Sequence, residues 1–206
     1  MRVSATTLEQ FRLYMTEDWM EEASLIANIK GEFRSTPQIE LGQAYHSIIE
    51  DPDRYLVPGG FSCRGFSFDM EHVRPALDLV DRRGVFEVKG TIEIDGVTLV
   101  GRADHVFGAS IHEFKTTTGT FDPDKYLNSV QWRVMGLIFE PRVITYHVFC
   151  LVDSPNGVIA LKSVETMNVY PYPAMREDVT RLVREFRAYV VAKGLDGVLR
   201  ARQAAA

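Results

Sequence analysis

The feature that most constrains the fold is a run of three segments in which apolar and polar residues alternate. They are Val85–Asp95, Val97–Phe107 and Ile111–Thr116, and a period of two residues is typical of half-buried strands. Asp95-Gly96 is a strong signal for a two-residue hairpin turn, and Gly108-Ala109 can form the second turn. The run therefore predicts a three-stranded antiparallel unit.

The two turns determine which residues face one another across this unit. Asp104 is expected to lie across from Glu113 in one neighbouring strand and from Glu87 in the other. The next row is basic and consists of Lys89, Arg102 and Lys115. Directly opposed carboxylates have Cβ atoms roughly 5 Å apart and repel each other unless a cation lies between them. A divalent metal with oxygen ligands removes that repulsion, so the pairing predicts a metal site at Asp104 and Glu113.

Two other interpretations of the charged face stay open. A bulge or a longer turn would change the pairing, and charged residues on the open side of an antiparallel sheet are ordinary. The opposite face is apolar, as a sheet that packs against helices requires. Its residues are Phe86, Val88, Ile92, Ile94, Val97, Leu99, Ala103, Phe107 and Phe114.

The segment before this unit reads as helical. A capping box, Thr6-x-x-Glu9, predicts the start of a first helix, and a second is expected from Trp19 to about Lys30. Thr36-Pro37 begins a third helix, in which Ile39, Gly42, His46 and Ile49 recur at helical spacing. Gly42 would allow close approach to the sheet. On spacing alone, His46 reads as a core residue more readily than as a metal ligand.

The remaining elements complete a mixed sheet flanked by helices. Residues 51–83 form an insert with turn signals, and Asp122-Pro123 caps a helix. The inner stripe of that helix is Leu127, Val130, Gln131, Val134 and Ile138. Gln131 is its polar exception and by itself reads as a solvent-facing residue.

The C-terminal part is expected to add two strands and a helix. The strands cover 142–153 and 157–170 and are joined through Ser154-Pro155-Asn156. An amphipathic helix then covers about 174–193. Its off-stripe residues Arg176, Arg184 and Arg187 indicate a solvated face more readily than phosphate contacts.

Composition is that of a single intracellular enzyme domain spanning residues 1–206, with 46% hydrophobic and 25% charged residues. Two cysteines, Cys63 and Cys150, are too few for a disulfide framework or a four-thiolate cluster. The first residues lack an apolar signal segment, so we expect a cytoplasmic protein without membrane contact. The net charge of −5 leaves any nucleic-acid contact to local basic residues.

The order of His46, Gly101-Arg-Ala-Asp104, Glu113-Phe-Lys115-Thr116 and Gln131 resembles the PD-(D/E)XK nuclease superfamily. More narrowly, it resembles the RecB-like exonuclease branch, because Gly42 to His46 matches its Gly-x-x-x-His motif. The resemblance covers the chain from Ser4 to about Tyr146. It implies a restriction-endonuclease-like core with a catalytic sheet and helices at about 84–170.

The chain departs from related nucleases in three places. It lacks the four cysteines that hold an iron-sulfur cluster in some relatives, so we expect no such cluster. A Cys-Pro pair common after the first helix signal is replaced by Leu13-Tyr14-Met15. A tyrosine often found four residues after the glutamine is replaced by Met135, which weakens the expectation for substrate placement near Gln131.

The resemblance implies a deoxyribonuclease, most simply an exonuclease, that uses one or two Mg²⁺ or Mn²⁺ ions. The metal ligands would be Asp104, Glu113, the carbonyl of Phe114 and His46, with Lys115 and Gln131 completing the catalytic set. DNA, single- or double-stranded, is the expected partner, together with a recombination or replication protein, and by analogy the compact size is compatible with a phage-encoded nuclease. Alternatives are an inactive DNA- or protein-binding module of the same fold and a metal-dependent hydrolase of small phosphorylated substrates.

Overall fold

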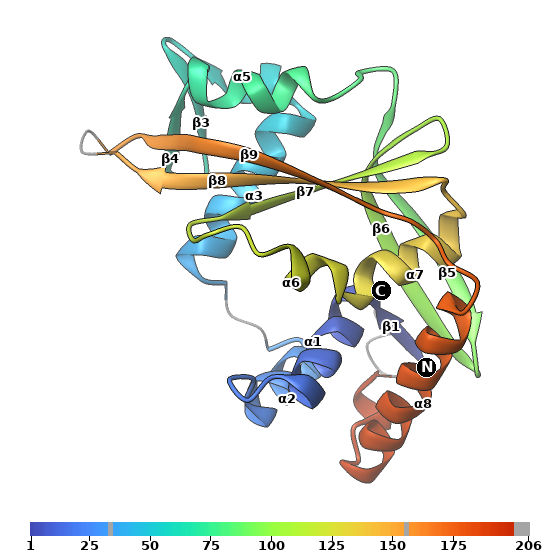
Figure 1. Cartoon of the computed structure of the whole chain (residues 1–206). Coiled ribbons are helices and arrows are strands. Elements are labelled where there is room, and N and C mark those ends of the chain that lie inside the picture. The colour runs from blue at the N-terminus through green and yellow to red at the C-terminus, as the bar shows by residue number, and fades with distance from the viewer. Residues whose placement is uncertain (33–34, 155–156, 200–206) are drawn as a thin grey trace.

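A computed structural model of the chain describes residues 1–32, 35–154 and 157–199. A mixed sheet of six strands forms its centre, in the order β1-β6-β7-β8-β9, with β5 paired to β6 (Figure 1). The strands are β1 (Arg2–Ser4), β5 (Val85–Ile94), β6 (Val97–Phe107), β7 (Ser110–Thr117), β8 (Val143–Asp153) and β9 (Ile159–Val169). The predicted class, a mixed sheet flanked by helices, is confirmed.

Helices cover both faces of this sheet. Those of the N-terminal half are α1 (Ala5–Thr16), α2 (Glu22–Lys30), α3 (Pro37–Glu50), α4 (Pro52–Tyr55) and α5 (Met70–Asp78). Those of the C-terminal half are α6 (Pro123–Leu127), α7 (Val130–Phe139) and α8 (Met175–Ala192). Helices α3 and α5 lie on one side of the central sheet, and α1, α7 and α8 lie on the other (Figure 1).

The apolar residues of the central hairpins divide among three clusters, which corrects the prediction of one apolar face; Ala103 packs in one of them with Trp132 and Met135 of α7. Val97 and Leu99 pack with α1, α7 and α8, where Phe11 and Phe186 are also buried. Phe114 packs instead with Tyr45 of α3 and with its neighbours from the insert. Parallel pairing requires crossover connections, and these place helices on both faces of a sheet.

The register predicted for the hairpins is confirmed where the strands pair. Lys89 pairs with Arg102 and Phe86 with His105 in β5–β6, and His105 pairs with His112 in β6–β7. Asp95 and Gly96 both have positive φ, 53° and 73°, as a type I′ turn requires. The carboxylate of Asp95 also binds Arg184 of α8, while Arg187 donates to its carbonyl. Arg184 and Arg187 are exposed, as a solvated face predicts, and they also hold this turn.

Several predicted boundaries in the N-terminal half are wrong. Ser4, two residues before the predicted capping box, is the N-cap of α1, and its Oγ accepts the backbone N–H of Thr7 at 3.0 Å. Helix α2 begins at Glu22, so Trp19 lies in the preceding turn. The helix predicted to begin at Thr36-Pro37 is confirmed as α3, with Thr36 as its N-cap.

The segment from Asp122 is two helices rather than one. Ser129 starts α7, and its Oγ accepts the backbone N–H of Gln131 at 3.2 Å. Leu127, predicted to face inward, is 49% exposed because it closes the short helix α6. The break sets the direction of α7 independently of α6.

The insert and the C-terminal segment form regular strands and helices. The insert carries a small sheet of β2 (Leu56–Val57), β3 (Gly60–Cys63) and β4 (Phe66–Asp69), followed by α5. The predicted strands 142–153 and 157–170 are confirmed as β8 and β9, whereas Pro155 and Asn156 lie outside the described residues. Within the described part of the chain, every helix is too short or too polar to cross a lipid bilayer.

Candidate metal and catalytic centre

The predicted site residues gather where β7 separates from β6. The β6–β7 ladder runs from Phe107–Ser110 to His105–His112, while β1 pairs in parallel with Thr98 to Val100 of β6. Residues 101–104 lie between these two pairings on the same strand. The strand β1, which the sequence did not reveal, thus limits one side of the opening that holds Asp104.

Beyond the pair His105–His112, hydrogen bonds between backbone and side chains take the place of the β6–β7 ladder. The backbone N–H of Asp104 donates to Glu113 Oε1 at 3.2 Å, and the N–H of Phe114 donates to Asp104 Oδ2 at 2.8 Å. Each carboxylate therefore binds the backbone of the opposite strand. This reciprocal pair holds the two carboxylates close together, as the register predicted, with Glu113 only 3% exposed.

Lys115 lies on the same strand face as Glu113, because side chains two residues apart share a face. Its Nζ is 3.1 Å from Glu113 Oε2 and 4.0 Å from Asp104 Oδ2. Burial, together with the charge of Asp104, raises the pKa of Glu113 to about 7. Burial alone would favour a neutral lysine, but the two carboxylates raise the pKa of Lys115 above its ordinary value. Lys115 is therefore a fixed positive charge in the site.

Helix α3 brings His46 to the same carboxylates. His46 Nδ1 is 3.9 Å from Asp104 Oδ2, and its ring meets Phe114 edge-on, with centroids 6.1 Å apart. The close approach depends on Gly42, since a Cβ there would lie 2.7 Å from Thr116 Oγ1. Burial lowers the pKa of His46, against the opposing effect of Asp104. A neutral imidazole has a lone pair that a metal can use.

Gln131, at the start of α7, completes the set that the structure brings together. Its Nε2 is 3.5 Å from Thr6 Oγ1 of α1, and its side chain lines the same cavity as Asp104 and Lys115. This cavity has a volume of about 430 Å³, and Lys89 and Arg102 also line it. The basic row predicted beside the acidic one is thus part of the cavity wall.

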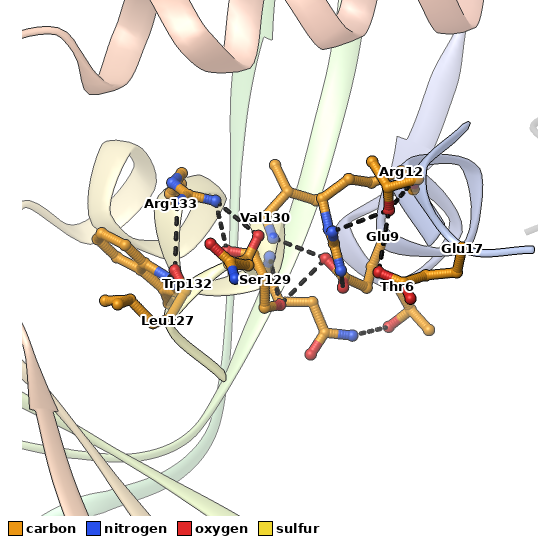
Figure 2. Close-up of polar contacts among 12 residues, drawn as sticks. Thr6, Glu9, Arg12, Glu17, Leu127, Ser129, Val130, Trp132 and Arg133 are labelled. Carbon is orange, nitrogen blue, oxygen red and sulfur yellow. Dashed lines mark hydrogen bonds and ion pairs between the residues drawn. The ribbon is translucent and has the colours of Figure 1, made fainter. Parts of the chain in front are cut away.

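A buried carboxylate that sequence reasoning placed in a capping box instead fixes α7. Glu9 accepts from Ser129 Oγ at 3.0 Å and from the backbone N–H of Val130 at 2.6 Å, and it pairs with Arg12 at 2.8 Å. Figure 2 shows Glu9 between its own helix and the start of α7. Ser129 and Val130 lie 120 and 121 residues away from Glu9 in the chain, so local sequence carries no signal for the contact with α7.

Glu87 departs from the predicted acidic row. Its φ is 55°, an unusual left-handed value for a residue within a strand, and its carboxylate binds Arg102 at 2.7 Å. Burial raises the pKa of Glu87, while Arg102 opposes that shift. Glu87 lines an adjoining cavity with His46 and Asp104. It therefore lies near the candidate metal centre, but its carboxylate is paired with Arg102.

The donor set fits a hard divalent cation. Asp104 and Glu113 offer carboxylate oxygens, Phe114 a backbone carbonyl, and His46 a neutral ring nitrogen. Oxygen ligands suit Mg²⁺ and Mn²⁺, and a nitrogen ligand shifts the preference toward the transition metal. A cation close to Glu113 stabilises the negative charge of this buried carboxylate. In this structure the ammonium group of Lys115, 3.1 Å from Oε2, is such a cation.

A second group with metal-ligand chemistry lies outside this centre. Asp69, Glu71 and His72, at the start of α5, each place one ligand atom within 4.8 Å of the others. Asp69 and Glu71 have intermediate to high exposure, and His72 Nε2 is 3.6 Å from Glu71 Oε1. Sequence analysis did not single out these residues, although their i, i+2, i+3 spacing at a helix start is visible.

Comparisons with known proteins identify the fold. No protein-family profile matches the chain, and no curated protein matches its sequence. An alkaline exonuclease from Laribacter hongkongensis, LHK-Exo, superposes with a TM-score of 0.52 at 14% identity, covering 100% of this chain and 95% of that one. The same enzyme in complex with dAMP gives a TM-score of 0.50 at 15% identity, with coverages of 99% and 94%.

A protein from Eubacterium rectale, provisionally named an exonuclease, also matches, with a TM-score of 0.52 at 14% identity over 93% of this chain and 81% of that one. At such identity these likenesses establish the fold alone. The chain has the fold of these exonuclease structures, which is the fold that its resemblance to the PD-(D/E)XK superfamily implied.

Proposed function

We propose that this protein is a divalent-metal-dependent deoxyribonuclease that acts as an exonuclease. The observation that carries the proposal is the interlocked pair Asp104 and Glu113 with Lys115 Nζ at 3.1 Å and 4.0 Å from their oxygens. Two carboxylates in one cavity can hold the cation that metal-assisted phosphodiester hydrolysis uses, and a lysine beside them can offset the charge of the phosphate. The exonuclease structures of the same fold support this reading.

In the proposed reaction, Asp104, Glu113, the Phe114 carbonyl and His46 hold the cation. When bound, it would polarise the scissile phosphate and lower the pKa of a water molecule. Lys115 would orient that water and offset the negative charge that develops on the phosphate. Glu113 fixes the position of the Lys115 ammonium group through the 3.1 Å contact, and Gln131 would hold the water or the backbone of the substrate.

DNA would approach along the basic part of the cavity. Lys89 and Arg102 line it together with the catalytic residues, whereas the whole chain has a net charge of −5. Binding would therefore rest on a few local contacts and should weaken steeply with salt. A recombination or replication protein remains the proposed partner in the cell.

Metal binding and catalysis can be tested separately. We expect isothermal titration calorimetry to show Mn²⁺ and Mg²⁺ binding to the native protein, with strongly reduced affinity in Asp104→Asn. Lys115→Met should keep metal binding but lose cleavage of linear DNA by about 100-fold or more, because loss of one group that stabilises developing charge costs roughly 10²–10³ in rate. Glu93→Gln, on the neighbouring strand, is the matched control for charge removal.

Three outcomes would contradict the proposal. Cleavage that persists in excess chelator would exclude metal-assisted hydrolysis. A native protein that binds DNA but leaves it intact with either metal would favour the inactive binding module, and turnover of model phosphodiesters without cleavage of polynucleotides would favour the small-substrate hydrolase.

A further inference from the structure

A second cavity, of about 620 Å³, opens directly beside the catalytic one. The cavity lined by Asp104, Glu113 and Lys115 is called the catalytic cavity below. The second cavity shares Lys115 and Gln131 with it, so one molecule can extend past these two residues and occupy both cavities. Its other walls come from α1, from the turn between α1 and α2, and from α6. The volume falls within the range of about 300–1,000 Å³ that is usual for ligand sites.

An exposed tryptophan forms one wall of this second cavity. Trp19 is 66% exposed, and it lines the cavity together with Leu13 and Tyr126. The core fixes the turn that carries Trp19. The next residue, Met20, is buried in the core with 8% exposure, and its N–H donates to Glu17 O at 3.1 Å. The indole is therefore presented to the cavity by an anchored turn.

The charges of the second cavity disfavour a phosphate chain. Four carboxylates line it, those of Glu9, Glu17, Asp122 and Asp124, against three basic side chains, those of Arg12, Lys115 and Lys125. Arg12 is paired with Glu9 at 2.8 Å, and Figure 2 shows both within the network that joins α1 to α7. The catalytic cavity differs, since Lys89, Arg102 and Lys115 there face Asp104 and Glu113. Phosphates are thus favoured in the catalytic cavity and a neutral group in the second.

We infer that the second cavity holds an unpaired nucleobase, stacked on Trp19, of a nucleotide adjacent to the phosphodiester in the catalytic cavity. Aromatic side chains stack on any base through its π-face, and the amides of Gln10 and Asn128 in the wall can donate to and accept from a base edge. A base in this position cannot be paired. The substrate class is therefore a single strand, or a duplex end whose last nucleotide has separated.

This inference rests on the proposed function for the identity of the substrate, but its test does not need cleavage. Binding is measured by fluorescence anisotropy in excess chelator, with a short labelled oligothymidylate and with a chain of equal phosphate number whose sugars are abasic. We expect the native protein to prefer the base-bearing chain. Trp19→Ala should weaken binding of that chain by about 5- to 150-fold, the range for one stacked base, and leave abasic binding unchanged.

The chain provides a matched control and an internal reporter. Trp19→Phe keeps an aromatic ring and should retain most of the preference. The sequence has two tryptophans, and the other, Trp132, is 3% exposed, so quenching of the native fluorescence by oligothymidylate would report on Trp19.

The outcomes separate this inference from the proposed function. Equal binding of both chains by the native protein, equal losses for both in Trp19→Ala, or no loss at all would overturn the nucleobase site, even if the protein cleaves DNA. A Trp19-dependent preference in a protein that cleaves nothing would support the nucleobase site and overturn the nuclease.

Discussion

The charge of the candidate centre depends on Asp104, Glu113 and Lys115. Each carboxylate takes a backbone N–H from the opposite strand, and Lys115 keeps its proton because both carboxylates raise its pKa. Burial raises the pKa of Glu113 to about 7, so near neutral pH a bound cation would displace a proton from this carboxylate. Metal binding is accordingly expected to release protons.

His46 is the residue on which we expect the choice between Mn²⁺ and Mg²⁺ to depend. His46→Ala is expected to weaken Mn²⁺ binding by about tenfold or more, a loss typical for damage to a metal site, and to weaken Mg²⁺ binding less, because nitrogen ligands favour the transition metal. Calorimetric titration with each ion measures both effects. His72→Ala, which alters the exposed group at α5, is the control, and a larger Mn²⁺ loss in that variant would contradict the prediction.

At the scale of elements, the contact between α1 and α7 positions Gln131. Glu9 is 8% exposed and satisfies Ser129 Oγ, the Val130 N–H and Arg12 together. Its negative charge at the start of α7 also interacts favourably with the dipole of that helix. Gln131 follows Val130 in the first turn of the same helix, so a shift of α7 would move its side chain away from the cavity that Asp104 and Lys115 line.

Glu9→Ala should lower the free energy of unfolding by about 2–4 kcal/mol, because it leaves buried donors without an acceptor. Chemical denaturation measures this loss. Glu21→Ala removes the same charge from an exposed position and should change stability by less than about 0.5 kcal/mol. Equal stability of the two variants would show that the buried carboxylate does not join the helices.

At the scale of the whole molecule, the sequence predicts those features that residues close together in the chain determine, such as strand register and helix starts. Alternation and turn chemistry gave the register around Asp104, and Thr36-Pro37 gave the start of the helix that carries His46. Contacts between distant segments were not predictable: β1 has three residues, too few to show a period, and Glu9 meets partners more than 100 residues away. Trp19 was assigned to a helix because nothing local indicated that α2 starts later.

Three histidines in adjacent strands of the central sheet link stability to pH. His105, His112 and His147 lie side by side, with His112 Nδ1 3.0 Å from His147 Nε2. Burial, and next the proximity of His112, lowers the pKa of His147 to about 4 from its ordinary 6.5. Because the folded-state value is lowered, the stability that this residue contributes is complete above pH 6.5 and is lost as pH falls toward 4.

His147→Leu should therefore make unfolding less sensitive to acid. Between pH 7 and pH 4 the native protein is expected to lose up to about 3 kcal/mol more than the variant, the free energy equivalent to this pKa shift. Denaturant titrations at both pH values measure the difference. The same loss in both proteins would show that His147 titrates normally.

The central claim is that Asp104 and Lys115 belong to a nuclease site, and the most direct measurement is degradation of end-labelled linear DNA beside covalently closed circles in Mg²⁺ or Mn²⁺. We expect the native protein to degrade the linear DNA and to leave the circles intact, and we expect Asp104→Ala and Lys115→Ala to leave both forms of DNA intact. Cutting of circles would make the enzyme an endonuclease. Native and variant proteins that are equally inert, or equally active, on every form of DNA would contradict the assignment of this site.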